Sequence, residues 1–496
     1  MMQQLDAVWQ QQTEKSMLIS GNDSLTYPEF LQQVSRYKAL LAELSASSVA
    51  LCIDNGIDWL LIDIACQQLN IVLLPLPSYF SAEQIQHSVT TAGCDLLIVD
   101  VQLSEAFVEQ FSAAELIEQG TDISIYRLPY AKLAQDKKCL PKLTAKITFT
   151  SGTTGQPKGA CLSLQHQWQV ASALAKSMTS HITKHLCVLP LATLLENIAG
   201  VYAPLLSGAT VEVPSLASLG FNGCSSLDFK KFINQVSQSQ PSSIITTPEL
   251  LKGLVHACEM GWQAPKSLQF IAVGGAHTPQ SLLDAARAKG LPAYQGYGLS
   301  ECCSVVSLNT FGNNNSKSAG RLLPHLEAEI KQGEIFVRGS IFLGYAGDRA
   351  SWGKTEYATG DLGYLDEDGY LFIQGRKKNT LISSFGRNIN PEWIESCLLA
   401  QRHIKQAIVF GDAKPFCCAA IYIDKQLTSF EQVSKSIKAL NQTLPDYAQI
   451  KSHFYLTKAI LPNSELMTAN GRIRRQAALA YFDEQLNDIY QLGFAS

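Results

Sequence analysis

The chain has 496 residues, of which 46% are hydrophobic and 17% are charged, and its formal net charge is -4. This length predicts about three domains, or one large domain with a smaller partner, and it excludes a single small binding module. The composition is typical of a folded globular protein and excludes a disordered or fibrous chain. Lysine and arginine number 39 against 43 acidic residues, with no basic tract, which disfavours nucleic-acid binding.

Membrane and metal signals are weak. Residues 1–17 show no apolar segment behind a basic start, and no stretch reaches the roughly 18 apolar residues of a membrane span. The 13 cysteines lack CxxC spacing and include adjacent pairs at 302–303 and 417–418, which fits neither a disulfide framework nor a zinc site. We therefore expect a cytoplasmic protein with no transmembrane segment and no structural metal.

Helix-like and strand-like stretches alternate between residues 26 and 110. This alternation predicts strands joined by crossover helices, and hence an α/β fold for the first half of the chain. The helix-like stretches are 27–44 and 57–70, and the short apolar runs are 48–54, 71–76 and 95–100.

A loop rich in glycine, serine and threonine follows the strand-like run Ile147–Thr150. Small residues let the backbone approach an anion, hydroxyl and main-chain N–H groups bind phosphate oxygens, and Lys158 adds a compact positive charge. The spacing is not that of a Walker A loop or a dinucleotide fingerprint. The alternative for such a loop is a plain flexible turn. The loop residues are Thr150, Ser151, Gly152, Thr153, Thr154, Gly155, Pro157, Lys158 and Gly159.

Two regions after the loop have clear patterns. Residues 164–178 carry apolar side chains at helical spacing and predict an amphipathic helix. Residues 326–375 show short alternating runs, with Asp368-Gly369 suited to a hairpin turn, and predict a β-rich subdomain. We place the domain boundary near residue 375, giving a large domain over 1–375 and a small domain over 376–496.

The run TSGTTGQPKG at 150–159 resembles the signature phosphate loop of the adenylate-forming superfamily, which includes acyl-CoA synthetases, nonribosomal-peptide adenylation domains and firefly-type luciferases. The resemblance extends from LTYPEF at 25–30 to the basic cluster near residue 475. It implies an α/β fold with a large N-terminal domain, built of α/β subdomains and a β-rich subdomain, and a small mobile α+β C-terminal domain.

The same resemblance implies an ATP site. Tyr297 would stack on adenine, Ser300 would contact phosphate, and Glu301 would hold Mg²⁺. Asp361 and Arg376 would bind the ribose hydroxyls, for which a carboxylate and a forked donor are well suited. The full predicted set is Thr150, Ser151, Gly152, Thr153, Thr154, Gly155, Lys158, Gly274, Gly275, Ala276, Tyr297, Gly298, Ser300, Asp361 and Arg376.

The start of the small domain resembles the hinge of this superfamily, with Lys378 at the pivot position. Gly386 would then face the pantetheine arm of the thiol substrate. The alternative for Gly386 is a loop position that needs a positive φ.

Two positions depart from the family pattern. Arg472 stands where most members carry a lysine that bridges the substrate carboxylate and the phosphate. A guanidinium keeps the charge but has a different geometry. We expect Arg472, Lys158 and Glu301 to be catalytic. The alternatives are that a neighbouring arginine faces the site, or that the enzyme relies on Lys158.

The second departure is Thr193, which stands where acyl-CoA synthetases carry a histidine or an aromatic gate beside the acyl tunnel. The surrounding segment is similar to that of medium-chain and long-chain fatty-acid members. Amino-acid-activating members have an aspartate just after this position, whereas this chain has Leu194 and Leu195. An uncharged aliphatic or aryl acid is therefore expected.

The predicted activity is that of an AMP-forming acid–thiol ligase: ATP and Mg²⁺ convert a medium-chain or long-chain fatty acid to an acyl adenylate, and CoA then accepts the acyl group. A second hypothesis is a free-standing enzyme that loads a fatty or aryl acid onto the phosphopantetheine of a separate acyl carrier protein. A third, motivated by Arg472 and Thr193, is a nucleotide-binding protein without activity.

Overall fold

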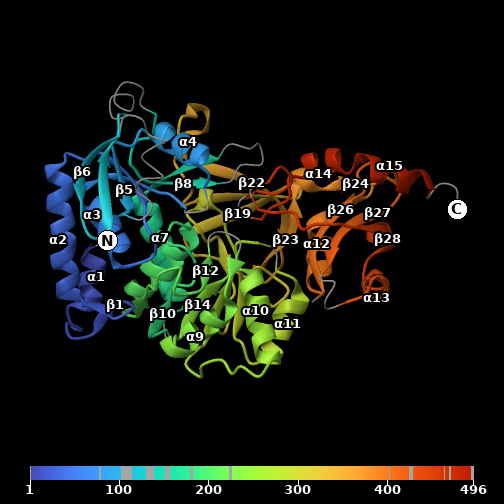
Figure 1. Cartoon of the computed structure of the whole chain (residues 1–496), viewed down its shortest axis with the longest axis horizontal. Coiled ribbons are helices and arrows are strands. Elements are labelled where there is room, and N and C mark those ends of the chain that lie inside the picture. Colours follow the sequence, from blue (N-terminus) through green and yellow to red (C-terminus); the bar gives the residue numbers. More distant parts are fainter. Residues whose placement is uncertain are drawn as a thin grey trace. The chain divides into compact units, whose positions relative to one another are not determined.

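The computed structural model describes residues 2–77, 80–101, 114–129, 139–150, 157–178, 182–222, 226–276, 278–401, 403–423, 428–462, 464–468 and 471–492. The chain divides into two compact units (Figure 1). The first comprises Met1–Gly275, Ala286–Ala328 and Val337–Tyr357, and the second comprises Ala276–Ala285, Glu329–Phe336 and Ala358–Ser496.

An eight-stranded sheet in the first unit carries the strands that flank the predicted phosphate loop. Its order is β21-β9-β8-β4-β3-β5-β7-β6. The central strands β8, β4, β3 and β5 run parallel, and β9 pairs antiparallel with β8. The strands are β21 (Gly344–Tyr345), β9 (Lys158–Ser163), β8 (Thr144–Thr150), β4 (Val72–Pro75), β3 (Ser48–Cys52), β5 (Leu96–Asp100), β7 (Ile123–Arg127) and β6 (Glu115–Gln119).

A second sheet of the same unit has nine strands, in the order β18-β17-β16-β15-β14-β10-β11-β1-β2. Its central strands also run parallel. The strands are β18 (Arg321–Leu322), β17 (Ser307–Leu308), β16 (Ala293–Tyr297), β15 (Phe270–Val273), β14 (Ser243–Thr246), β10 (Lys184–Leu186), β11 (Thr210–Glu212), β1 (Ser16–Ser20) and β2 (Asp23–Thr26). The short strands β12 (Phe221–Asn222) and β13 (Ser226–Leu227) form a separate pair.

Helix α3 (Ile57–Leu69) is the core helix of the first unit. It contacts β4 of one sheet and β1 of the other, and every residue from 59 to 67 is buried. A helix that is apolar on all sides has to be buried. The polar residues of this buried stretch, Asp63 and Gln67, must therefore find partners inside the core.

The other helices begin and end where local chemistry favours it. Helix α2 (Tyr27–Glu43) starts with a capping box in which the Thr26 N–H donates to Glu29 Oε2 at 2.8 Å. Helix α4 (Ala82–Ala92) ends at Gly93 with φ of 67°. The remaining helices are α1 (Met2–Trp9), α7 (Leu164–Ser177), the π-helix η1 (Glu196–Tyr202), α8 (Ala203–Leu206), α9 (Phe229–Ser239), α10 (Pro248–Glu259) and α11 (Gln280–Ala288).

A four-stranded sheet, in the order β19-β20-β22-β23, forms the predicted β-rich region. The hairpin is confirmed: β22 and β23 pair antiparallel up to Leu365 and Leu371, and Gly369 in the turn has φ of 79°. The strands are β19 (Leu326–Lys331), β20 (Glu334–Gly339), β22 (Glu356–Leu365) and β23 (Leu371–Arg376), and the short 3-10 helices of this region and its neighbours are η2 (Ser300–Cys302), η3 (Arg349–Ser351) and η4 (Lys377–Asn379).

The last part of the second unit is an α+β layer structure. Its sheet β26-β27-β28 has α12 and α13 on one face and α14 and α15 on the other (Figure 1). Alternate residues of each strand feed the two cores, as a pleated strand requires. The elements are β24 (Leu381–Ile382), β25 (Asn388–Ile389), α12 (Pro391–Leu399), β26 (Ile404–Phe410), β27 (Cys417–Ile423), α13 (Phe430–Asn441), η5 (Asp446–Ala448), β28 (Ile450–Tyr455), α14 (Arg475–Tyr481) and α15 (Asp483–Leu492).

These elements confirm the predicted α/β class, including the alternation over the described residues between 26 and 101 and the helix after the predicted phosphate loop. The second compact unit begins before the predicted boundary at 375, so that boundary stays a prediction. Every cysteine in the described part of the chain is a free thiol. No helix within the described ranges combines the length and the apolar character needed to cross a membrane.

Candidate active site

The β8–β9 hairpin builds the base of the predicted phosphate loop. The two strands pair antiparallel, and Thr150 at the end of β8 lies opposite Lys158 at the start of β9. The predicted site residues Ser151, Gly152, Thr153, Thr154 and Gly155 lie outside the described residues. Gly159 is tightly packed, because a Cβ there would meet the Phe149 ring at 2.8 Å. The strand pair therefore holds the two ends of the predicted loop side by side.

Tyr345 joins two predicted catalytic residues. The Lys158 ammonium lies 5.2 Å from the centre of the Tyr345 ring, a cation–π contact. The Tyr345 hydroxyl donates a hydrogen bond of 2.7 Å to Glu301 Oε1 and lies 3.1 Å from the Tyr357 hydroxyl. Burial and the Glu301 charge raise the pKa of the Tyr345 phenol, so it stays a neutral donor. The structure thus brings the predicted phosphate cation and the predicted metal carboxylate to one aromatic ring.

The motif around Glu301 has a constrained backbone. Tyr297 ends β16, and Ser300 and Glu301 begin the short helix η2. A Cβ on Gly298 would lie only 1.7 Å from the Ser304 carbonyl oxygen, so this position accepts glycine alone. The Glu301 carbonyl accepts from the Phe342 N–H at 2.7 Å. The segment that carries the predicted adenine and metal residues is therefore held by close backbone packing.

Two glycines of the predicted ATP site lie just after β15. Gly274 donates its N–H to the Thr246 carbonyl at 3.1 Å, and Gly275 has φ of 83°. The nearest atom to a Cβ built on Gly274 is Leu195 Cδ2, at 3.7 Å. Ala276 is exposed and belongs to the second compact unit. Leu195, in the segment of the predicted acid gate, thus packs against Gly274.

The gate segment leads directly into the π-helix η1. Thr193 is partly exposed; its N–H bonds to the Pro190 carbonyl at 2.9 Å, and its carbonyl accepts from the Asn197 N–H at 3.2 Å. At the far end of the helix the Ala203 N–H reaches back to the Ile198 carbonyl, an i to i−5 bond. π-Helical turns are rare in proteins, and those that occur are often found at functional sites.

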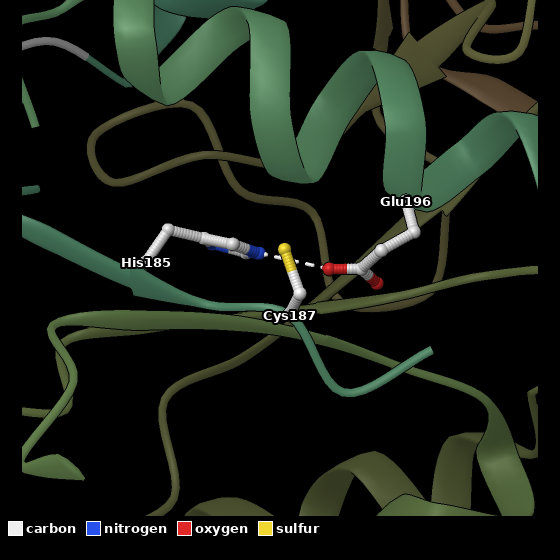
Figure 2. Close-up of side chains that lie close together, drawn as sticks. All are labelled: His185, Cys187 and Glu196. Carbon is white, nitrogen blue, oxygen red and sulfur yellow. Dashed lines mark hydrogen bonds and ion pairs between the residues drawn. The ribbon is translucent and has the colours of Figure 1, made fainter. Parts of the chain in front are cut away.

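A buried cluster anchors the first residue of η1 (Figure 2). His185 Nε2 lies 3.1 Å from Glu196 Oε1, and the Cys187 thiol lies beside them. A ring nitrogen of His185, Cys187 Sγ and a carboxylate oxygen of Glu196 all lie within 4.8 Å of one another. Burial raises the pKa of the Glu196 carboxyl, and His185 opposes that rise. The other carboxyl oxygen points away from His185 and Cys187 (Figure 2). The hydrogen bond between His185 and Glu196 holds the cluster together. Gly200 packs closely against it: a Cβ at this position would lie only 2.4 Å from Glu196 Oε1.

A second buried cluster contacts Asn197 and Tyr202 of η1 and was not predicted. Lys146 of β8 is 1% exposed and pairs with Asp63 of α3 at 3.0 Å. Burial lowers the pKa of Lys146, and the Asp63 charge raises it. The sequence signal was available: a lysine within a strand-like apolar run and an aspartate within a mainly apolar helix are rarely buried unless paired. Tyr345 was missed because nothing near it in the sequence distinguishes it from a core aromatic residue.

In the second unit, the predicted ribose ligands face each other on one hairpin. Asp361 and Arg376 are direct partners in the β22–β23 register, and Arg376 Nε lies 2.8 Å from Asp361 Oδ1. Arg376 Nη1 also donates to the Thr359 carbonyl at 3.0 Å. Burial lowers the pKa of Lys378, the predicted hinge residue, and the charges of Arg376 and Arg472 lower it further.

The remaining predicted residues lie in exposed turns. Gly386 is exposed with φ of 72°, so the alternative of a loop that needs a positive φ fits its conformation. Arg472 is exposed in a turn closed by its own N–H on Thr468 Oγ1 at 3.0 Å. The neighbouring Arg475 is different: it bonds the buried Glu395 carboxylate at 2.6 Å. That ion pair assigns Arg475 to the core of its unit.

The fold is that of an α/β ligase-like protein with a large N-terminal and a small C-terminal domain. The family model for AMP-binding enzymes matches residues 5–346, and the model for the AMP-binding enzyme C-terminal domain matches residues 378–492. The chain belongs to the family of AMP-binding enzymes. The predicted membership in the adenylate-forming superfamily, as an acyl-CoA-synthetase-like acid–thiol ligase, is confirmed.

The chain is similar in sequence and in fold to proteins named as CoA ligases or CoA synthetases. The chain is 27% identical to the 2-succinylbenzoate–CoA ligase of Bacillus pumilus, covering 80% of this chain and 82% of that protein. It is 28% identical to the long-chain-fatty-acid–CoA ligase FadD15 of Mycobacterium bovis, covering 74% and 72%. Its fold is similar to that of the O-succinylbenzoate coenzyme A synthetase of Bacillus subtilis solved with AMP, with a TM-score of 0.73, 24% identity and 96% coverage of each chain.

Proposed function

We propose that the protein activates a carboxylic acid with ATP and transfers the acyl group to CoA. In the first step a carboxylate oxygen attacks the α-phosphorus of ATP, a new P–O bond forms, and the bond to pyrophosphate breaks. In the second step the thiol sulfur attacks the acyl carbon, a C–S bond forms, AMP leaves, and the thiol proton passes to solvent. The acid needs no general base, because a carboxylic acid is already ionised at neutral pH.

One observation carries this proposal: Lys158, at the start of β9, and Glu301 both contact Tyr345, the lysine through the ring and the glutamate through the hydroxyl. Lys158 supplies a cation for phosphate oxygens, and the Glu301 carboxylate, fixed by the phenol, is an oxygen ligand of the kind that Mg²⁺ prefers. A magnesium ion held there would neutralise charge on the phosphates. Thr150, Ser151, Gly152, Thr153, Thr154 and Gly155 would complete the phosphate loop.

The roles assigned to the small domain follow the family resemblance. We propose that Arg472 supplies the cation that pairs with the acid and phosphate during adenylation, and that Asp361 and Arg376 bind the ribose. Their 2.8 Å ion pair supports this role, because the carboxylate and the guanidinium lie close enough together to bind one sugar. Lys378 as hinge and Gly386 as a contact of the thiol arm remain proposals of the same kind. Tyr297, Gly298 and Ser300, with Gly274, Gly275 and Ala276, would form the adenine side.

For the acid, we propose an aryl carboxylic acid of the 2-succinylbenzoate type. The names of the Bacillus relatives support this class. The uncharged side chains Leu194 and Leu195 beside Thr193 also suit an aryl group. A medium-chain or long-chain fatty acid is the second candidate, supported by the 28% identity to FadD15.

The test is acid-dependent release of pyrophosphate by the purified protein with ATP and Mg²⁺. Parallel reactions contain 2-succinylbenzoate, benzoate, decanoate or palmitate, each with and without CoA. We expect release with an aryl acid that increases with CoA and yields AMP and the thioester. Pyrophosphate release that is the same with and without CoA would instead indicate a carrier protein as the acceptor. ATP binding without release from any acid would contradict the proposal and favour an inactive nucleotide-binding protein.

A further inference from the structure

The buried pair of Lys146 and Asp63 links the strand of the phosphate loop to the core helix. Lys146 lies on β8, the strand that ends at Thr150, and Asp63 lies on α3. Their side chains are 2% and 0% exposed, and the closest N···O distance is 3.0 Å. The ion pair therefore fixes β8 against an element that is itself buried on all sides.

The lysine also reaches the gate helix. Lys146 Nζ donates to Asn197 Oδ1 at 2.6 Å and to the Tyr202 hydroxyl at 2.8 Å. With Asp63, these acceptors use all three N–H donors of the ammonium. Asn197 in turn donates its backbone N–H to the Thr193 carbonyl at 3.2 Å. A continuous chain of contacts thus runs from β8 to the predicted gate residue.

The acceptors are themselves held in place. Asn197 Nδ2 and the Tyr202 hydroxyl both donate to Asp63 Oδ2, and Gln67 Nε2 donates to the same carboxylate at 3.1 Å. The Tyr202 ring stacks on Trp168 at 4.6 Å, and Trp168 Nε1 donates to Gln67 at 2.9 Å. A rotation of η1 would break several of these bonds at once.

We propose that Lys146 is a positioning residue for acid activation, which holds the gate at Thr193 at a fixed distance from the strand that leads into the phosphate loop. The inference rests on the proposed function, because it takes the Thr193 segment as the acid site and the loop after Thr150 as the phosphate site. The attacking carboxylate and the α-phosphorus must then meet at a defined separation. A misplacement of about 1 Å is enough to cost on the order of 100-fold in rate.

Stability alone is a weak explanation for this cluster. A buried ion pair gains little over well-packed apolar residues of the same volume, because both charges must be desolvated. Here the pair also lies among aromatic rings, with Lys146 Nζ 5.7 Å from the Trp59 ring centre and 5.1 Å from that of Tyr202. Unlike apolar packing, the hydrogen bonds of the ammonium are directional. They therefore fix the positions of α3 and η1 relative to β8.

Two variants separate positioning from folding. Lys146→Met combined with Asp63→Asn removes both charges without leaving one unpaired. Asn197→Ala leaves the ion pair intact and removes its side-chain link to the gate. The matched control is Lys184→Met combined with Glu212→Gln, which removes another lysine–carboxylate pair of the same unit, 2.6 Å apart.

The measurements are steady-state kinetics of pyrophosphate release and amide hydrogen exchange on the full chain. We expect kcat/KM for the acid to fall by about 10- to 100-fold in both variants, while KM for ATP changes far less. Exchange over residues 190–202 should become faster in both variants and stay unchanged in the control. Combining Asn197→Ala with the charge-pair variant should add little, because both changes break one link.

The inference is overturned if both variants keep the acid kcat/KM and the exchange rates of the parent protein, even at a lowered melting temperature. That result would leave the cluster a structural element only. A parent protein that releases no pyrophosphate with any acid would instead refute the proposed function. The exchange comparison needs no turnover, so it still decides whether Lys146 holds the gate segment.

Discussion

The Tyr345 hydroxyl donates a 2.7 Å hydrogen bond to Glu301 Oε1, while the ring of the same tyrosine lies under the Lys158 ammonium. A hydrogen bond to a charged group is worth about 1.5–3 kcal/mol. We therefore expect Tyr345→Phe to raise the Mg²⁺ concentration for half-maximal activity and to lower the adenylation rate by about tenfold or more. Magnesium titrations of pyrophosphate release test this. Tyr357→Phe, which removes the 3.1 Å contact to the Tyr345 hydroxyl, is the control. Equal effects of the two variants would exclude the role of Tyr345.

Arg472 lies exposed in a turn, so its replacement should leave the fold intact. We expect Arg472→Ala to abolish acid-dependent pyrophosphate release with no change in melting temperature. Arg472→Lys should retain activity, because an ammonium keeps the charge and is the group that the family resemblance implies at this position. An unaffected rate in the alanine variant would remove Arg472 from the mechanism and direct attention to Arg474.

The Glu395 carboxylate is buried and accepts from Arg475 at 2.6 Å and from the Val409 N–H at 2.7 Å. Removing one partner of such a pair leaves an uncompensated charge and costs about 3–5 kcal/mol. We expect Arg475→Met to lower the free energy of unfolding of the C-terminal unit by that amount in urea titrations. Adding Glu395→Gln should recover part of the loss, and no recovery would argue against the ion pair as the cause.

Gly200 packs on the histidine–glutamate cluster of Figure 2. A Cβ there would lie 2.4 Å from Glu196 Oε1 and 2.8 Å from His185 Nε2. Overpacking of this kind costs about 1–3 kcal/mol. We expect Gly200→Ala to lower the melting temperature, and Gly253→Ala in α10, which would meet the Phe229 ring, offers a comparison outside η1. Only the first variant should also raise KM for the acid.

His325 makes stability depend on pH. Burial, with a smaller contribution from His166, lowers the pKa of His325 from 6.5 to about 4. The unfolded chain therefore binds a proton near pH 6.5 that the folded chain does not bind until about pH 4, so stability falls as the pH falls through this window. Thermal unfolding from pH 7 to pH 4 should show a smaller loss for His325→Gln than for the parent protein. Identical pH profiles would show that the imidazole is not responsible.

The sequence predicted the architecture well, because it depends on local patterning. The hairpin at Asp368-Gly369, the crossover helices and the amphipathic helix after the loop each carry their signal within a few residues. The family resemblance indicated the pairing of Asp361 with Arg376 as ribose ligands, but their direct contact needs the β22–β23 register. The bonds of Lys146 to Asp63 and of Tyr345 to Glu301 join residues far apart in the chain, and single-sequence patterning holds no signal for which charges meet in the core.

The π-helix after the gate has a consequence for how substrate preference can change. Such a helix amounts to an α-helix with one residue inserted, so its two ends differ in phase by about 100° from an uninterrupted α-helix. Deleting one residue from Glu196–Tyr202 would restore the ordinary phase and detach either the His185 side or the Lys146 side of the helix. A change of length here therefore breaks one set of contacts completely. On the proposal that the Thr193 segment is the acid site, a gradual shift from one acid to another has to come from side-chain substitutions at 191–195.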